Sequence, residues 1–315
     1  MRFPANKLAA LTSAAALSMC CILAAPAAHA ELIIGLNSDN QILSFDSATP
    51  AITTPAITVT GLASGDLLVG IDRRPSLGPN NGALYGLAQN SSVPTLGRLY
   101  IINPVTGVAT LASTLSVPLS GGVGTTFGID FNPVPDRLRI VNTFDQNLRV
   151  NVDTGATIVD STLFYPSFDP NSSANPNIVA VAYSNNFGGA TSTVLRDIDS
   201  ALDILATQNP PNLGFLNTQF GLGIDIREIA GYDISGVTGT QYAVFALDED
   251  FLTPTNFYTI SGSGATLVGP VGTGEILLDI AAPVGLQQFA VPEPGSLSLL
   301  GLGMLGLFAA RRRRA

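Results

Sequence analysis

The stretch that decides the fold is TFGIDFNPVPDRLRIVNTFDQNLRVNVDTGATIV, residues Thr126–Val159. Apolar and polar side chains alternate along two of its segments, the period of half-buried antiparallel strands. Asn132-Pro133 and Asp153-Thr154-Gly155 supply turn residues between the apolar runs. The stretch therefore predicts four short strands, which are Phe127–Asp130, Arg137–Val141, Asn147–Val152 and Ala156–Val159.

Weaker copies of this four-strand unit recur along the chain. The opening strand of each copy ends at a comparable place, and these places are Asp72, Asp130, Tyr183, Asp233 and Asp279. Asp72 and Asp279 are 207 residues apart over four intervals, about 52 residues each. Four strands repeated at this period are typical of the blades of an all-β propeller.

The two ends of the repeat together make one blade. Glu31–Val59 holds three strands and lacks an opening strand, whereas Glu275–Ala281 is an opening strand with nothing after it. Pairing the N- and C-terminal strands gives five blades and leaves no free sheet edge. Six blades or an irregular barrel are the alternatives, and Asp197–Leu205 could form a short helix in place of the predicted hairpin.

Residues 1–30 have the features of a secretory signal peptide. Arg2 and Lys7 precede an apolar run, and Ala28-His29-Ala30 forms a small-x-small cleavage site, so we expect signal peptidase to release a chain that begins at Glu31. A retained membrane anchor is the alternative, although the apolar run is short.

This cleavage has a chemical consequence for the mature chain. Cys20, Cys21 and His29 are the only cysteines and the only histidine, and all three lie in the signal peptide. Without them the mature chain cannot use serine–histidine or cysteine–histidine catalysis, a disulfide, or a zinc site built on His or Cys. The packed core alone has to hold the domain together.

The mature domain is strongly acidic. Residues 31–290 contain no lysine, eight arginines and 22 acidic residues, a difference of −14. Such a surface disfavours nucleic acid and anionic membranes as partners, and it tolerates or binds cations. Solubility outside the cell is the simpler interpretation of the same charge.

The C-terminal tail, residues 291–315, is a separate element. It consists of Val291-Pro292-Glu293-Pro294, the apolar run Gly295–Ala310, expected to form a short transmembrane helix, and the basic cluster Arg311–Arg314. An arginine cluster of this kind favours the cytoplasmic side, which would leave the domain outside. An ordinary tail anchor is the alternative.

In this order and at this position, the tail resembles the PEP-CTERM sorting signal. The resemblance implies a Gram-negative bacterium, transient anchoring in the inner membrane, and processing by an exosortase at the Pro-Glu-Pro motif. It also implies delivery to the cell surface or the extracellular space, often together with extracellular polysaccharide.

The body of the chain, about residues 31–280, resembles a bacterial family of unknown function, numbered 4394. The resemblance rests on FGIDFNPVPDRLRIVNTFDQNLRVNVDTGA and on AVAYSNNFGGATSTVLRDIDSALDILATQNPPNLGFLNT. It supports a propeller-like repeat and implies no activity.

The candidate metal ligands are Asp72, Asp130, Asp233 and Asp279. Opening strands of a propeller surround its central channel, so these carboxylates are expected to converge there. A ring of carboxylates suits Ca²⁺, and paired carboxylates could serve glycoside hydrolysis. Alternatively, each Asp simply ends its strand by accepting backbone N–H groups, and no cofactor is bound. Tyr183 interrupts the ring in the middle blade.

Two weaker patterns carry charge. Arg137, Arg139 and Arg149 could form a stripe that binds an anionic sugar, or a solvated strand face. Asp248-Glu249-Asp250 is either a cation site or an exposed acidic loop.

From these features we expect a non-catalytic binding or structural module at the cell surface. Extracellular polysaccharide or surface proteins are its expected partners. The alternative is a hydrolase or lyase acting on extracellular polysaccharide through its carboxylates, with or without calcium.

Overall fold

A computed structural model describes residues 30–247 and 254–286 of the chain. Ala28 and His29 of the predicted cleavage site, the acidic run Asp248-Glu249-Asp250 and the whole C-terminal tail lie outside these residues. No helix within the described part is long and apolar enough to cross a membrane. The predicted transmembrane helix falls in the tail and therefore outside this description.

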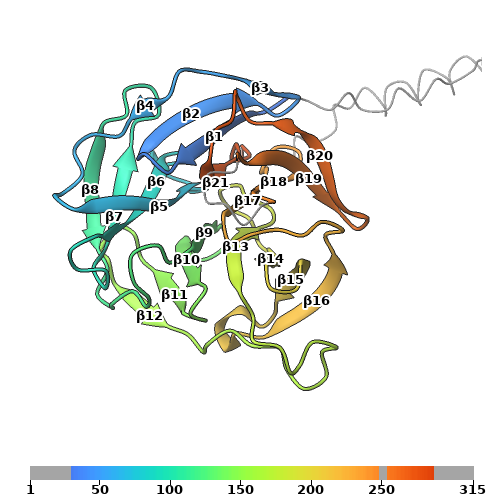
Figure 1. The fold of residues 1–315 in the computed structure, drawn as a ribbon. Coiled ribbons are helices and arrows are strands. Elements are labelled where there is room, and N and C mark those ends of the chain that lie inside the picture. Colours follow the sequence, from blue (N-terminus) through green and yellow to red (C-terminus); the bar gives the residue numbers. More distant parts are fainter. Residues whose placement is uncertain (1–29, 248–253, 287–315) are drawn as a thin grey trace, which may run out of the picture.

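The described strands form five antiparallel sheets arranged around a common centre, as Figure 1 shows. Blade 1 consists of β21 (Leu277–Ala281), β1 (Leu32–Asn37), β2 (Gln41–Asp46) and β3 (Thr49–Thr53), with β4 (Ile57–Thr58) also paired to β2. Blade 2 consists of β5 (Asp66–Arg73), β6 (Leu84–Asn90), β7 (Gly97–Ile102) and β8 (Ala109–Thr114). Blade 3 consists of β9 (Phe127–Asn132), β10 (Arg137–Asn142), β11 (Asn147–Val150) and β12 (Thr157–Val159).

Blade 4 consists of β13 (Ile178–Tyr183), β14 (Leu195–Asp199), β15 (Ile204–Gln208) and β16 (Leu216–Gly221), with the 3₁₀ turn η1 (Pro211–Leu213) before β16. Blade 5 consists of β17 (Ala230–Ile234), β18 (Gln241–Phe245), β19 (Asn256–Ser261) and β20 (Gly264–Pro270). The five-bladed propeller predicted from the repeat is confirmed. The segment Asp197–Leu205 spans the predicted hairpin between β14 and β15.

The ring closes where the two ends of the domain meet. In blade 1, β21 pairs antiparallel with β1, so that Ile34 lies opposite Ala281 and Leu36 lies opposite Asp279. This pairing gives β1 a hydrogen-bonded neighbour on both sides, which removes the exposed edge that an open ring would leave.

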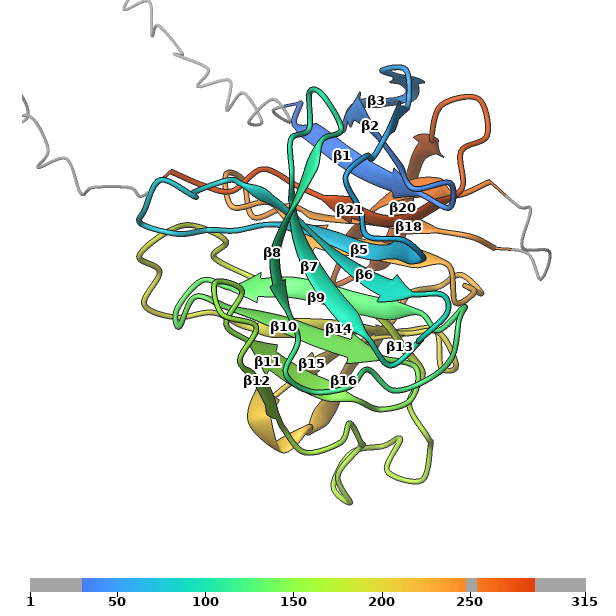
Figure 2. The same cartoon turned by 90° about the vertical axis from the view of Figure 1, so that its left-hand side faces the viewer.

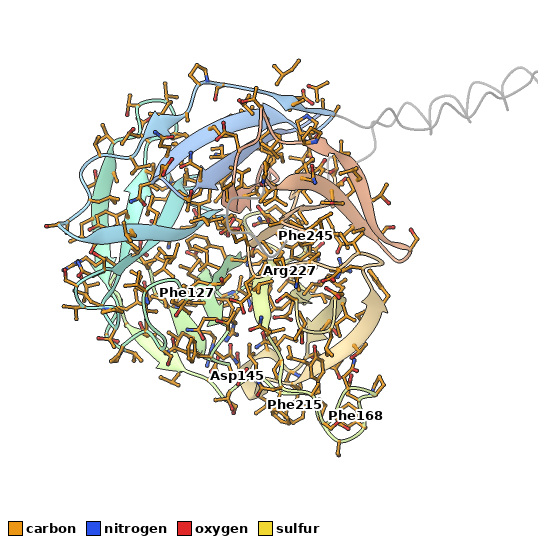
Figure 3. All side chains as sticks on the ribbon, viewed as in Figure 1. Phe127, Asp145, Phe168, Phe215, Arg227 and Phe245 are labelled. Carbon is orange, nitrogen blue, oxygen red and sulfur yellow. The ribbon has the colours of Figure 1, made fainter. Side chains whose placement is uncertain are left out.

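The hydrophobic core is divided among the five interfaces between blades. Between blades 2 and 3, for example, Tyr85 and Phe131 pack edge to face with ring centroids 5.2 Å apart. Figure 3 shows side chains filling these spaces, including Phe127 in blade 3 and Phe245 in blade 5. Strand alternation makes this possible, because one face of each blade packs on the preceding blade and the other face on the following blade.

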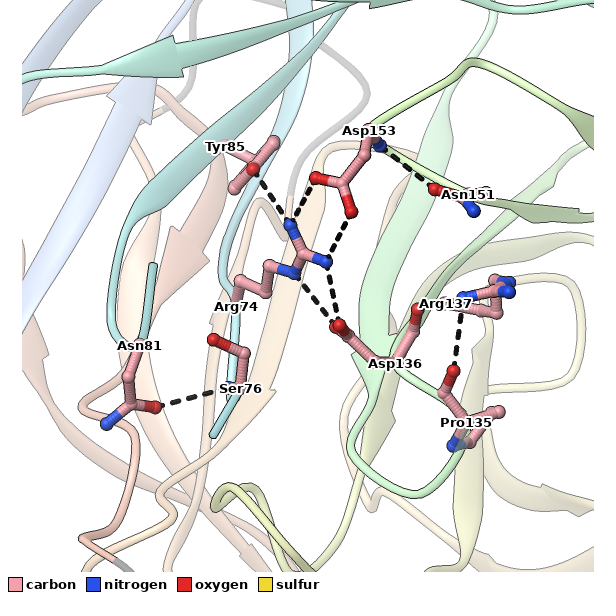
Figure 4. A network of polar contacts seen from close by, with 9 residues as sticks. All are labelled: Arg74, Ser76, Asn81, Tyr85, Pro135, Asp136, Arg137, Asn151 and Asp153. Atoms are coloured by element: carbon pink, nitrogen blue, oxygen red, sulfur yellow. Dashed lines mark hydrogen bonds and ion pairs between the residues drawn. The ribbon is translucent and has the colours of Figure 1, made fainter. Parts of the chain in front are cut away.

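Ion pairs also join neighbouring blades. Arg74, directly after β5, is buried and forms paired contacts with Asp136 and Asp153 of blade 3 (Figure 4). Its guanidinium nitrogens lie 2.7 Å from an oxygen of each carboxylate. The planar fork of arginine suits two carboxylates at once, so one side chain links two blades.

The hairpin turns contain the predicted turn residues, and in blade 4 an aspartate stands where the turns of blades 2 and 3 have glycine. Gly107 and Gly155 have positive φ angles of 70° and 73° in their hairpins. Asp203, at the corresponding place in blade 4, has a φ of 54°. Its carboxylate accepts a hydrogen bond from the backbone N–H of Ile226 at 2.9 Å, which ties this turn to the loop before blade 5.

Candidate functional site

The innermost strands of the five blades bring the predicted aspartates to the axis. β5, β9, β13, β17 and β21 each contact the next in a closed ring. Figure 2 shows the same blades from the side, with β9 and β10 lying alongside each other. Asp72 lies on β5, Asp130 on β9, Asp233 on β17 and Asp279 on β21. Each is at most 4% exposed.

Three of these carboxylates carry a shared pattern of hydrogen bonds. One oxygen accepts from the backbone N–H of the next residue, and the other accepts from the next inner strand. For Asp72 the donors are the N–H groups of Arg73, at 2.6 Å, and Phe131, at 2.7 Å. The corresponding donors are Ile234 and Ala282 for Asp233, and Ile280 and Ile71 for Asp279. The strand-ending interpretation therefore describes part of the site.

Asp130 departs from this pattern. Its Oδ1 accepts from the Tyr183 N–H at 3.0 Å, but its Oδ2 is buried and has no hydrogen-bond partner among the described residues. A buried carboxylate oxygen without a partner is costly, because water solvates it in the unfolded chain. The Asp130 side chain also contacts that of Asp233, and this contact lowers the pKa of Asp233.

Only three of the four predicted ligands come together. Asp72, Asp130 and Asp233 each offer one carboxylate oxygen, and these oxygens all lie within 4.8 Å of one another. We call this group the axial triad. Asp279 is not part of it, although its carboxylate also raises the pKa of Asp72 and of Asp130.

Burial sets the electrostatics of the axial triad. Loss of hydration raises the pKa of Asp72 and of Asp130 well above the usual range, and the neighbouring carboxylates raise both further. Burial likewise raises the pKa of Asp233 to about 7, although backbone N–H groups and Arg73 oppose the shift. The backbone N–H donors favour the ionised carboxylates, whereas burial favours the protonated ones. The two effects therefore oppose each other at each aspartate of the axial triad.

Arg73 is the arginine whose charge acts on this site. Burial lowers its pKa, while Asp72 and Asp233 raise it in turn. Its guanidinium donates to the Gly82 carbonyl at 2.9 Å. A single guanidinium balances one of three carboxylates, and the described residues include no lysine or histidine to balance the others. Protonation of the carboxylates, whose pKa values are raised, or a metal cation would balance the remaining charge.

The axial triad fits a hard cation of the size of Ca²⁺. Calcium binds carboxylate and carbonyl oxygens at about 2.3–2.6 Å, so two of its ligand oxygens are at most about 5 Å apart. The oxygens of the axial triad satisfy that limit. Three carboxylates leave several of its six to eight coordination positions to water or carbonyl oxygens.

The structure corrects the predicted position of Tyr183. Phe131 directly follows Asp130, and its backbone N–H donates to Asp72 in the preceding blade. The backbone N–H of Tyr183 donates to Asp130 in the same way, so Tyr183 occupies the position directly after that of the aspartate. The Tyr183 side chain points back to blade 3, where its hydroxyl accepts a 3.3 Å hydrogen bond from Arg139. Ala182, packed on the face toward blade 5, takes the place of the missing aspartate.

The predicted arginine stripe does not form one solvated face. Arg139 is 1% exposed and pairs with Asp160 at 2.6 Å. Arg149 is partly exposed and pairs with the same carboxylate, whereas Arg137 donates to the carbonyl of Pro135. The half-buried Arg73 and the buried Asp197 and Gln208 were not predicted, because single polar residues in a strand give no periodic signal.

Comparison with solved structures finds other proteins at low similarity. A structural genomics protein of unknown function from Bacteroides thetaiotaomicron VPI-5482 is 13% identical, with a TM-score of 0.43 and 82% of this chain covered. This chain spans only 65% of that protein's length. BBS1N in complex with ARL6DN is 10% identical, with a TM-score of 0.37, and coverage is 75% of this chain and 62% of that one.

A calcium-binding protein, regucalcin, from Agrobacterium tumefaciens strain C58 is 14% identical, with a TM-score of 0.39 and 78% of each chain covered. No curated protein matches the sequence.

Two family profiles match the sequence itself. A PEP-CTERM protein-sorting motif matches residues 290–314, which marks an exported protein that is transiently anchored in the membrane and processed by an exosortase. The domain of unknown function DUF4394 matches residues 41–281, the propeller from its second strand to its last. The chain therefore belongs to the DUF4394 family.

Proposed function

We propose that the domain is a non-catalytic binding module at the cell surface, with a calcium ion held in the axial triad as a structural centre. Extracellular polysaccharide is its proposed partner. The single observation that carries the calcium site is the convergence of Asp72, Asp130 and Asp233, whose carboxylate oxygens lie within 4.8 Å of one another. A divalent cation would hold three inner strands together and relieve the repulsion among their carboxylates.

Burial argues against catalysis at this centre. A pKa of about 7 at Asp233 would suit the general acid of a polysaccharide hydrolase, the alternative function. However, the three aspartates are 1–2% exposed, and both oxygens of Asp72 and of Asp233 already accept backbone N–H groups. A glycosidase needs its two carboxylates on either side of an accessible sugar bond.

Thermal unfolding of the exported, processed protein tests the calcium site. In EDTA and then with increasing calcium, the midpoint Tm should rise with concentration, because an ion that binds only the folded state stabilises it by mass action. Magnesium should act more weakly, since it requires shorter bonds in a stricter octahedron. Equilibrium dialysis should find a calcium ion lost on substitution of the axial triad.

Two variants locate the ion. Asp130→Asn removes one charge from the axial triad and should abolish the calcium-dependent rise while remaining folded in EDTA. Asp279→Asn is the matched control on β21 and should keep the rise. If Asp248→Asn with Asp250→Asn removes the rise instead, the ion binds the acidic run. A Tm unaffected by calcium would overturn the axial site.

A further inference from the structure

A groove of about 730 Å³ lies between blades 3 and 4. Three turns supply its walls, those after β9, before β14 and after β15. Its polar lining includes Asn132, Arg149, Thr193, Gln208, Asn209 and Asn212. The volume is in the range of ligand pockets, which is about 300–1,000 Å³.

A buried ionic network forms the base of this groove. Asp160 accepts from Arg149 at 2.7 and 2.9 Å and from Arg139 at 2.6 Å. Arg139 also donates to the side-chain oxygen of Asn212 at 3.0 Å. Two guanidinium groups share one carboxylate, and the charge of Arg139 also acts on the buried Asp197. Arg149 is the one charged side chain among the residues that line the groove, and its charge is positive. In a domain with a large excess of acids, this local charge favours an anionic ligand.

Gln208 supplies a second, independent indication of a ligand. It is 1% exposed, and its amide nitrogen donates to the Pro211 carbonyl at 2.6 Å. Gln208 lines the groove, and its Oε1 has no hydrogen-bond partner among the described residues. Buried amide oxygens are normally satisfied, so this acceptor calls for a donor such as a hydroxyl group.

We infer that the groove binds an acidic sugar chain, with a sugar carboxylate on Arg149 and a sugar hydroxyl donating to Gln208 Oε1. Arginine binds carboxylates through paired hydrogen bonds, and the asparagine and threonine side chains suit the mixed donors and acceptors of sugar hydroxyls. Val134, Pro135 and Val194 add apolar surface for the sugar ring faces. This inference deepens the proposed binding role and does not depend on the axial triad.

Calorimetric titration with trigalacturonate, performed in EDTA at low salt, tests the groove. We expect saturable binding that weakens as salt is raised, because the main contact is ionic. Maltotriose, a neutral chain of equal length, should bind at least about tenfold more weakly, as one lost charged contact is worth roughly a factor of ten or more. Because EDTA removes calcium, the result is separate from the test of the axial ion.

Variants on one hairpin place the binding site. Arg149→Gln should weaken trigalacturonate binding at least about tenfold, and Asp160 keeps its contact with Arg139 in that variant. Arg137→Gln makes the same charge change at a residue that does not line the groove, and it should change the affinity by less than Arg149→Gln does. Gln208→Met should weaken both sugars.

Three results would overturn the inference. They are no binding of trigalacturonate, equal binding of maltotriose by the unmodified protein, or equal losses in Arg149→Gln and Arg137→Gln. Should Arg149→Gln fail to fold, Arg149→Lys in the same titration keeps the charge and removes the planar fork, and unchanged affinity there would reject paired recognition.

Discussion

Gly231 in β17 faces the backbone of Asp279 in β21 so closely that a β-carbon on Gly231 would lie 2.6 Å from the Asp279 Cα atom. A β-carbon on Gly128 in β9 would likewise lie 2.9 Å from the Cα atom of Ala180 in β13. These contacts let the inner strands approach within the ring and bring the axial carboxylates together. Backbone cannot move aside as a flexible side chain can, so these positions tolerate no larger residue.

Gly231→Ala should therefore destabilise the propeller by about 2–4 kcal/mol, the cost of forcing extra volume into a packed core. Chemical denaturation of the exported, processed protein measures the loss. Gly262→Ala is the control, because no heavy atom lies within 4 Å of a β-carbon there. Equal stability of the two variants would show that the inner strands can separate without cost.

Arg74→Lys should lower the free energy of unfolding by about 1–3 kcal/mol, because a lysine cannot make paired contacts with two carboxylates. Asp136 and Asp153 are more exposed than Arg74, so much of the loss comes from leaving a buried cation poorly paired. Arg137→Lys changes an arginine that contacts neighbouring carbonyls and should have little effect. A double-mutant cycle with Asp153→Asn measures the coupling between blades.

Asp197→Asn should raise Tm at pH 8 by a few degrees. In a domain of this size, each kcal/mol of added stability raises Tm by about 2–4 °C. Both oxygens of Asp197 are buried without hydrogen-bond partners among the described residues, and burial raises its pKa well above the usual range, with Arg139 opposing. Over the interval between the unfolded and folded pKa values, the folded state binds more protons, so its stability falls as pH rises.

The difference between Asp197→Asn and the unmodified protein should therefore vanish near pH 4 and grow toward pH 8. Thermal scans across this range measure it. Asp39→Asn, at an exposed turn, serves as the control and should leave the curve unchanged. A difference that is constant with pH would mean that Asp197 is not titrating.

Glu293→Ala should block processing, because the Pro-Glu-Pro motif begins the sorting signal that matches residues 290–314. We expect an uncut chain that stays in the membrane fraction, detected by immunoblotting and mass. Gln288→Ala lies just before the matched segment and should be processed normally. Release of Glu293→Ala at the normal mass would place the recognised features elsewhere in the tail.

The blade repeat could be predicted because it depends on local chemistry. Turn residues such as Asp153-Thr154-Gly155 end each strand, and alternation assigns each side chain to one face. The incomplete units at Glu31 and Ala281 predicted closure, since an unpaired edge is unfavourable. Tyr183 was misplaced by one residue, and with a period of two such a slip moves a side chain to the opposite face.

By itself, the sequence determined the strands, the blade repeat and the C-terminal sorting motif, and it predicted a signal peptide whose cleavage would remove every cysteine and histidine. Only the tertiary structure decided that Asp72, Asp130 and Asp233 converge while Asp279 stays apart, that Arg139 is buried, and that Gln208 Oε1 lacks a partner. The physical reason is that these properties depend on how inner strands of different blades pack against one another. Those contacts join residues about 50 or more positions apart. The periodicity within one strand does not determine how far that strand is shifted along its neighbour in the next blade.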